Sequence, residues 1–110
     1  MKLRTLFSLC LGGIALTALA QGGYQDGVDY YNADRFEKAR TILQKTLNDA
    51  STNKAVSYFY LGSLDLREGN IQGAQTNFNN GIAADPDYGY NYVGLGEIAL
   101  KNEKKKFKTE

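Results

Sequence analysis

Apolar residues recur at three- and four-residue spacings through residues 53–84, which is the pattern of amphipathic α-helices. The first stretch, 53–68, has its apolar positions at Ala55, Val56, Phe59, Leu61 and Leu66. Gly69 and Asn70 interrupt it, and glycine suits the residue after a helix because it tolerates a positive φ. A second stretch carries Ile71, Ala74, Phe78 and Ile82. It should end at Asp85, because Pro86 disfavours helical geometry in the residue before it.

The same two-helix pattern precedes this segment and begins again after it. Residues 23–33 predict one helix and Asp34 a turn. The next predicted helix, 36–49, has its apolar positions at Phe36, Ala39, Leu43 and Leu47. A polar connector follows, in which Ser51 or Thr52 is expected to cap the next helix. Residues 88–101 predict a further helix, after which the pattern fades into charged residues.

Three glycines mark an internal repeat. Gly27, Gly62 and Gly96 follow one another at intervals of 35 and 34 residues. Small residues stand twelve positions after the first two glycines and large apolar ones sixteen positions after them, at Ala39, Ala74, Leu43 and Phe78. The chain is therefore expected to hold about two and a half copies of one helical hairpin.

The repeated glycine needs a structural reason, because glycine inside an exposed helix costs about 1 kcal/mol relative to alanine. We expect Gly62 to let the first helix of its hairpin press against Ala74 of the second helix. A large side chain at either position should separate the helices and cost roughly 1–3 kcal/mol by overpacking.

These residues resemble the repeat pattern of the tetratricopeptide repeat family. The second unit matches it at Tyr58, Leu61, Gly62, Gly69, Ala74, Phe78 and Pro86, and departs from it at Asp65 and Gly81. The first unit matches at Gly27, Tyr30, Phe36, Ala39 and Leu47, and departs at Asp34, Leu43, Thr46 and Ser51. The third keeps Tyr92, Leu95 and Gly96, and this register places Tyr92 in the core.

The resemblance implies an all-α fold, an α-solenoid of hairpins in a right-handed stack. The expected units are residues 21–52, 53–87 and 88–102, the last being a first helix alone, followed by a basic tail at 103–110. About three units are needed for stability. Charges at 104–108 stand where Ile71 and Ala74 stand in the second unit, so we expect a truncated array. The unpaired last helix is expected to offer a surface for a homodimer.

The resemblance also implies that the first helices line a concave face that binds a peptide or protein. The positions expected to point into it are Tyr24, Val28, Tyr31, Asn32, Phe59, Ser63, Arg67, Val93, Glu97 and Lys101. Arg67 and Lys101 share one register and are candidates for clamping a carboxylate of the partner, although the family's clamp on an acidic C-terminus needs more Asn and Lys positions than this chain has. For Tyr24, Phe59 and Val93, groove and core remain equally open. Leu66 and Leu100, in the same set of positions, are expected to be core.

The N-terminal residues predict a secretory signal peptide at 1–20. Lys2 and Arg4 precede an apolar run over residues 6–20 that ends in Ala-Leu-Ala, with cleavage expected between Ala20 and Gln21. A transmembrane anchor is less suited, because a spanning helix needs roughly 20 apolar residues. A lipoprotein signal at Cys10 does not fit the bulky Leu9 before it. The expected location is periplasmic or extracellular, in a bacterium.

The amino-acid composition excludes several classes of metal site and catalytic site. The chain has no His and a single Cys, which excludes a Cys/His zinc site and the His-dependent catalytic triads and dyads. The carboxylate pairs Asp26–Asp29 and Asp65–Glu68 are interpreted as solvated, and no metal or cofactor is expected. The formal net charge of +1 does not favour a nucleic-acid partner.

The sequence therefore favours a protein-interaction module that is not an enzyme. The alternatives are a structural scaffold or spacer of a cell-envelope assembly and, less favoured, an arm of a larger enzyme. The basic tail is interpreted as solvated, with no stable membrane insertion after signal cleavage.

Overall fold

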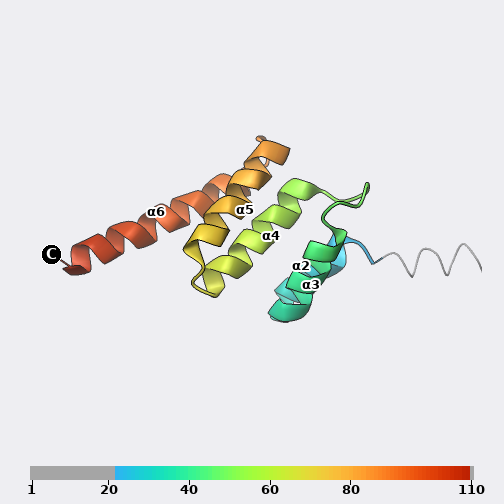
Figure 1. The fold of residues 1–110 in the computed structure, drawn as a ribbon, viewed down its shortest axis with the longest axis horizontal. Helices are drawn as coiled ribbons and strands as arrows, with labels where there is room; N and C mark the ends of the chain where they lie inside the picture. The colour runs from blue at the N-terminus through green and yellow to red at the C-terminus, as the bar shows by residue number, and fades with distance from the viewer. Residues whose placement is uncertain (1–21, 110) are drawn as a thin grey trace, which may run out of the picture.

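The computed structural model describes residues 22–109, which form five α-helices and no strand (Figure 1). The helices are α2 (Tyr24–Asn32), α3 (Phe36–Thr46), α4 (Lys54–Arg67), α5 (Ile71–Ala84) and α6 (Tyr90–Thr109). The described part of the chain is thus all-α, as predicted. The predicted signal peptide at 1–20 and its cleavage point lie outside the described residues.

Two of the connections are tight turns of the same kind. After α4, Asn70 N–H donates to the Asp65 carbonyl (2.8 Å) while Gly69 adopts a φ of 79°. After α2, Arg35 N–H donates to the Tyr30 carbonyl (2.8 Å) while Asp34 adopts a φ of 61°. This six-to-one bond around a left-handed residue is the Schellman ending of a helix. Each hairpin therefore closes in the same way, with a small polar residue replacing glycine in the first.

The N-termini of α4 and α5 are capped by asparagines. The side-chain oxygen of Asn53 accepts from Val56 N–H (3.3 Å), and that of Asn70 accepts from Gly73 N–H (3.0 Å). The expectation that Ser51 or Thr52 caps α4 is wrong. The Thr52 hydroxyl instead donates to the Thr46 carbonyl at the end of α3, because α4 begins one residue later than that expectation requires.

Two helix ends differ from the expected bounds. α3 ends at Thr46, before the predicted residue 49, and α6 continues through Thr109. Residues 103–109 are therefore helical and not a separate tail, and the predicted boundary at 102 is not a helix end. The physical reason is that lysine and glutamate are good helix formers, and neither glycine nor proline follows Gly96.

The helices pack as hairpins with α4 at the centre. α4 contacts α5 most extensively and also touches α2, α3 and α6, while α6 lies along α5 (Figure 1). One core cluster, Ala39, Leu43, Leu61 and Leu64, joins the first hairpin to α4. A second, Leu66, Ala74, Phe78 and Ile98, joins α4, α5 and α6. The prediction that Leu66 is core is confirmed.

The repeated glycines make room for a different residue than expected. A Cβ on Gly62 would lie 2.6 Å from the Phe78 ring, and one on Gly27 would lie 2.7 Å from Leu43 Cγ. The large residue sixteen positions after each glycine therefore lies over it, and for Gly62 it is Phe78, rather than the expected Ala74, that would meet an added side chain. Gly96 faces open space, since no second helix follows α6 in the described chain.

The Phe78 ring is enclosed from two sides by backbone. Besides Gly62 of α4, Gly94 of α6 lies against it, and a Cβ there would be 2.5 Å from the ring. Phe78 is completely buried. These two glycines thus allow three helices to meet around one aromatic side chain.

The orientation of α6 is set partly by a buried asparagine. The Asn91 side chain donates from Nδ2 to the Ala55 carbonyl (3.1 Å) and fills the space where a Cβ on Gly81 would lie. Gly81 therefore departs from the alanine of the repeat pattern to admit Asn91. The packed face of α6 is Asn91, Gly94, Leu95 and Ile98. Tyr92, expected in the core, is consequently 50% exposed, and Leu100, also expected there, is 65% exposed.

Candidate functional site

Six aromatic side chains form a row that crosses both hairpins and reaches α6. We call Phe36, Tyr31, Tyr60, Phe59, Tyr88 and Tyr90 the aromatic row. Ring centroids of neighbours lie 5.5 Å apart for Tyr31–Phe36, 5.0 Å for Tyr31–Tyr60 and 5.1 Å for Phe59–Tyr60. Phe59 continues it to Tyr90 at 5.6 Å and Tyr88 at 6.3 Å. Most contacts are edge-to-face, the arrangement that aromatic quadrupoles favour.

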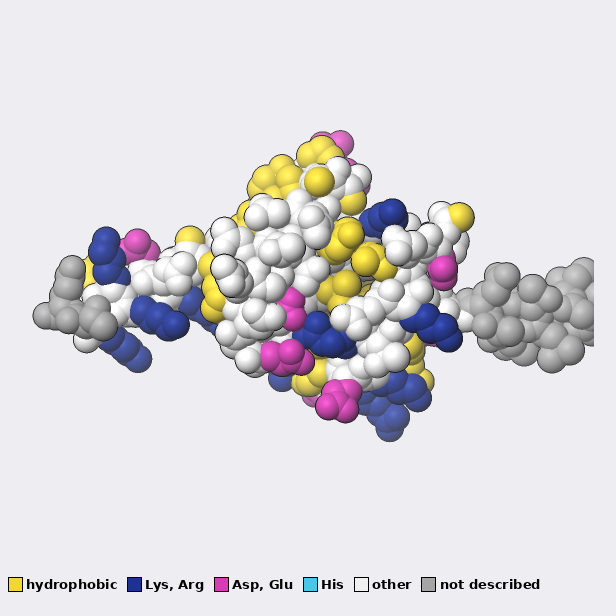
Figure 2. All heavy atoms as spheres, in the orientation of Figure 1, with side chains coloured by type: hydrophobic (Ala, Val, Ile, Leu, Met, Phe, Trp, Pro, Cys, Tyr) yellow, Lys and Arg dark blue, Asp and Glu magenta, His cyan; other side chains and the backbone are white. Residues whose placement is uncertain are grey.

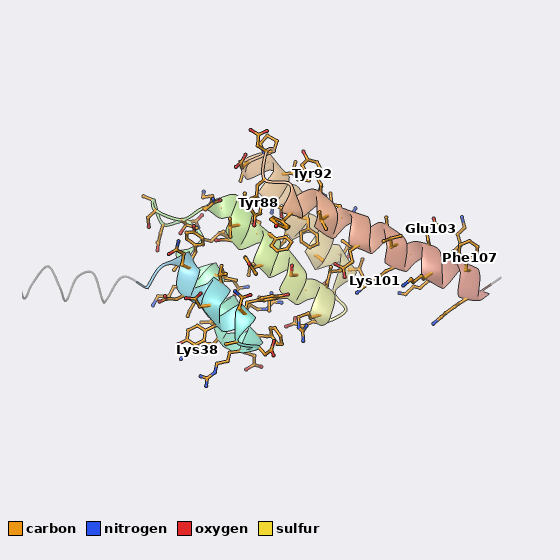
Figure 3. The ribbon with its side chains drawn as sticks, turned by 180° about the vertical axis from the view of Figure 1, so that it is seen from behind. Lys38, Tyr88, Tyr92, Lys101, Glu103 and Phe107 are labelled. Atoms are coloured by element: carbon orange, nitrogen blue, oxygen red, sulfur yellow. The ribbon has the colours of Figure 1, made fainter. Side chains whose placement is uncertain are left out.

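The aromatic row is neither core nor surface alone. All its members except Tyr90 are half-buried, and Tyr90 is exposed. Phe59 also contacts the buried ring of Phe78, at 6.1 Å between centroids. Figure 3 shows Tyr88 on the side of the molecule formed by α2, α4 and α6. The row therefore rests on the core along one edge and presents its other edge to solvent.

An open cleft adjoins the aromatic row between α2 and α4. Its volume is about 360 Å³. It is lined by Tyr24, Gln25, Val28, Asp29, Val56 and Tyr60. Tyr24 and Val28, two of the predicted groove residues, thus come together here. The lining combines apolar surface with one carboxylate and two phenol groups.

The predicted groove residues of α4 are engaged within the protein to different degrees. Phe59 belongs to the aromatic row and is half-buried against the Phe78 ring. The Ser63 hydroxyl donates to the Phe59 carbonyl (2.9 Å) in its own helix. The Arg67 guanidinium lies 3.8 Å from the centroid of the Phe36 ring, a cation–π contact that links α4 to the first hairpin. Arg67 nevertheless stays exposed.

The remaining predicted groove residues are exposed at the two ends of the stack. Asn32 is at the end of α2, while Val93, Glu97 and Lys101 lie on α6. Lys101 points away from the edge of α6 that carries Tyr92 (Figure 3). The cleft between α2 and α4 does not include these residues.

The cleft includes residues that the repeat register did not select. Tyr60 and Val56 occupy other positions of the first helix, yet both line the cleft. The signal available in the sequence was the run of three aromatics at 58–60, which is more than one core position requires.

One carboxylate pair was misread. Asp65, interpreted as solvated, is 5% exposed. Arg40 Nη2 donates to its Oδ1 (2.9 Å), and Asn77 Nδ2 donates to its Oδ2 (2.7 Å). The same Arg40 nitrogen donates to Glu68 Oε2 (3.0 Å). Asp65 therefore ties α3, α4 and α5 together, because a buried carboxylate needs charged or polar partners.

Two phenols of the aromatic row resist ionisation. Burial raises the pKa of Tyr60 above its ordinary value of 10.0, and the neighbouring Tyr31 and Tyr90 raise it further. Burial also raises the pKa of Tyr88, with added contributions from Tyr60, Tyr90 and Tyr24. The cause is the cost of placing a phenolate where water is partly excluded and other phenolates are near.

This pKa direction predicts a loss of stability at alkaline pH. Because the folded pKa of Tyr60 lies above the unfolded one, its contribution is present below pH 10.0 and is lost as the pH rises toward the folded pKa. Urea unfolding at increasing pH should show this loss, and Tyr60→Phe should reduce it. A tyrosinate absorbance titration in which every phenol of the folded protein ionises at the ordinary pKa would contradict the prediction.

Neither a metal centre nor a membrane span emerges from the described residues. Within residues 22–109 there is no group of three or more His, Cys, Asp or Glu placed to hold a metal ion. In the same range, no helix combines the length and apolar character that crossing a membrane requires.

The arrangement can bind by surface contact: it offers rings that are already fixed, an adjacent cleft of mixed polar and apolar lining, and a carboxylate at its rim. Comparison of the chain with protein-family models, curated proteins and solved structures finds no match.

Proposed function

We propose that this chain is a tetratricopeptide-type interaction module that binds a peptide segment of another protein along the aromatic row and the adjoining cleft. The repeat register supports the repeat type, because Gly27 and Gly62 each admit the residue sixteen positions on. The two hairpins also close with the same turn. The predicted signal peptide supports a secreted, periplasmic or extracellular location.

The observation that carries the proposal is the half-exposed aromatic row beside an open cleft. Aromatic side chains provide large contact area with few rotatable bonds, so little entropy is lost when a partner covers them. Tyr24, Val28 and Tyr60 give this open cleft an apolar part that can contact one side chain. A scaffold or spacer, the alternative function, needs no such opening.

The charge at the cleft suggests what the peptide carries. Asp29 is exposed at the rim, and Gln25 and the phenols add hydrogen-bonding groups. A carboxylate beside Val28, Val56 and the tyrosine rings suits a cation next to an apolar side chain. We therefore propose a peptide with an aliphatic or aromatic residue adjacent to Lys or Arg.

A displayed library of random peptides, selected on the purified protein, tests the function. Selected peptides should share an apolar residue beside a basic one. Tyr24→Ala should weaken binding of the selected peptide about tenfold or more, as loss of an aromatic anchor does. Tyr24→Phe should retain most of the affinity, and Asp29→Asn should weaken it by a smaller factor. Titration calorimetry measures each affinity.

Gln72→Ala, at an exposed position of α5, is the matched control and should bind as the parent does. The proposal is wrong if no peptide is enriched, or if the selected peptides bind Tyr24→Ala as tightly as the parent protein.

A further inference from the structure

The large apolar side chains that are exposed in the described part of the chain all lie on α6. They are Tyr90, Tyr92, Val93, Leu100 and Phe107. Val93, Leu100 and Phe107 are seven residues apart, so they share one side of the helix. We call these three residues the α6 stripe. They are 64%, 65% and 76% exposed.

The positions on α4 that lie one repeat before the α6 stripe are covered by other parts of the protein. Phe59 and Leu66 of α4 stand 34 residues before Val93 and Leu100. Leu66 is buried in a cluster with Ile98 of α6, and Phe59 packs against Tyr88 and Tyr90. The following segment thus covers these positions on α4. On α6 the same positions have no cover within the described residues.

We propose that a second copy of the chain covers the α6 stripe, with the two α6 helices antiparallel and Leu100 at the two-fold axis. This axis brings Val93 against Phe107 of the partner subunit and Phe107 against Val93 of the partner subunit. Equal spacing on both sides of Leu100 makes the stripe self-complementary, as a two-fold interface requires.

The charges on α6 favour a second copy as the partner and an antiparallel arrangement of the two helices. The outer half of the helix carries five lysines, visible as a dark-blue group in Figure 2, at 101, 104, 105, 106 and 108. A parallel pair would place these groups side by side, which is unfavourable. An antiparallel pair places them beside residues 92–99 of the partner helix, where the charged residue is Glu97.

A specific ion pair follows from the same geometry. Glu97 lies three residues before Leu100 and Lys104 lies four after it, on the same flank of the α6 stripe. Around a two-fold axis at Leu100, Glu97 meets Lys104 of the partner subunit, and the reciprocal pair forms on the other side. The interface is one helix wide, so we expect a reversible dimer with a Kd in the micromolar range or weaker, roughly 10 μM or above.

The dimer would bury Val93 and Glu97, two predicted groove residues, and leave the cleft between α2 and α4 open. It therefore goes beyond the proposed peptide binding and does not depend on it. Variants of α6 test the dimer and variants of α2 test the cleft, so the two proposals fail separately.

Sedimentation velocity of the purified protein, from low micromolar to near-millimolar concentration, tests the proposal. The parent should shift from monomer to dimer with concentration. Leu100→Lys should remain monomeric throughout, at least a tenfold rise in Kd, with unchanged helicity by circular dichroism. Gln72→Lys adds the same charge on exposed α5 and should dimerise as the parent does.

Exchanging the charges of Glu97 and Lys104 tests the antiparallel arrangement. Glu97→Lys should weaken the dimer, and adding Lys104→Glu should restore it. A protein that is monomeric at every concentration would overturn the proposal, as would a dimer indifferent to Leu100→Lys or unrestored by the exchange. A monomer that binds anionic lipid vesicles through Leu100 would also overturn it, assigning the stripe to a membrane surface.

Discussion

Replacing Phe78 with alanine is expected to lower the free energy of unfolding by about 3–5 kcal/mol, as for other buried phenylalanines. The ring is completely buried and meets Gly62 and Gly94 on different helices. Neither glycine has a side chain that could move into the space, so the cavity should remain. Urea unfolding followed by circular dichroism measures the change. Asn79→Ala, at the next position and exposed, should change stability by about 0.5 kcal/mol or less.

A double-mutant cycle with Gly94 tests whether the Phe78 ring lies against α6. Gly94→Ala alone should destabilise by roughly 1–3 kcal/mol, because its Cβ would lie 2.5 Å from the ring. In the Phe78→Ala protein the same change should cost little or stabilise, since the ring is gone. Additive effects of the two changes would show that Phe78 does not lie against Gly94 in solution.

Replacing Arg40 with leucine is expected to lower the free energy of unfolding by roughly 2–3 kcal/mol. Arg40 is 23% exposed at its side chain, and its partner Asp65 would keep only Asn77 after the change. Removing one member of a largely buried pair leaves an uncompensated carboxylate, which costs more than the pair contributes. Chemical unfolding at neutral pH provides the measurement.

Glu68→Gln is the matched control, because Glu68 accepts from the same Arg40 nitrogen but is 59% exposed. It should change stability by about 0.5 kcal/mol or less, as exposed pairs do. Equal losses for Arg40→Leu and Glu68→Gln would contradict the role assigned to Asp65.

The hairpins could be predicted because their signals are local. The alternation of apolar positions, the break at Gly69 and the recurrence of Gly27 and Gly62 all appear within about one repeat. What lies across from each glycine could not be predicted, since side chains twelve and sixteen positions on both satisfied the pattern. Only the packed helices distinguish Phe78 from Ala74.

Two of the errors concern polar residues that became buried. Asn91 takes a core position of α6 because Gly81 leaves space for it, and this rotates Tyr92 and Leu100 toward solvent. A hydrophobic pattern does not reveal such a pair. Asp65 likewise depends on Arg40, which stands 25 residues earlier on another hairpin.

Part of the candidate site follows from the repeat register. Tyr24, Val28 and Phe59, three of the positions expected to point into a groove, lie at the cleft or in the aromatic row. Their role in binding stays a prediction. Tyr60 was missed because the repeat register selects no role for its position. It lines the cleft together with Val56 of the same helix.

The central position of α4 determines which parts of the protein unfold locally and which unfold only with the whole domain. α4 contacts all four other helices, whereas the C-terminal part of α6 extends beyond the rest of the fold (Figure 1). Backbone amides of α4 should therefore exchange with solvent deuterium only when the whole domain unfolds. Those near the end of α6 should exchange through local fraying. Cooperativity is thus greatest in the middle of the chain, and the lysine-rich end can lose its order without disturbing the cleft.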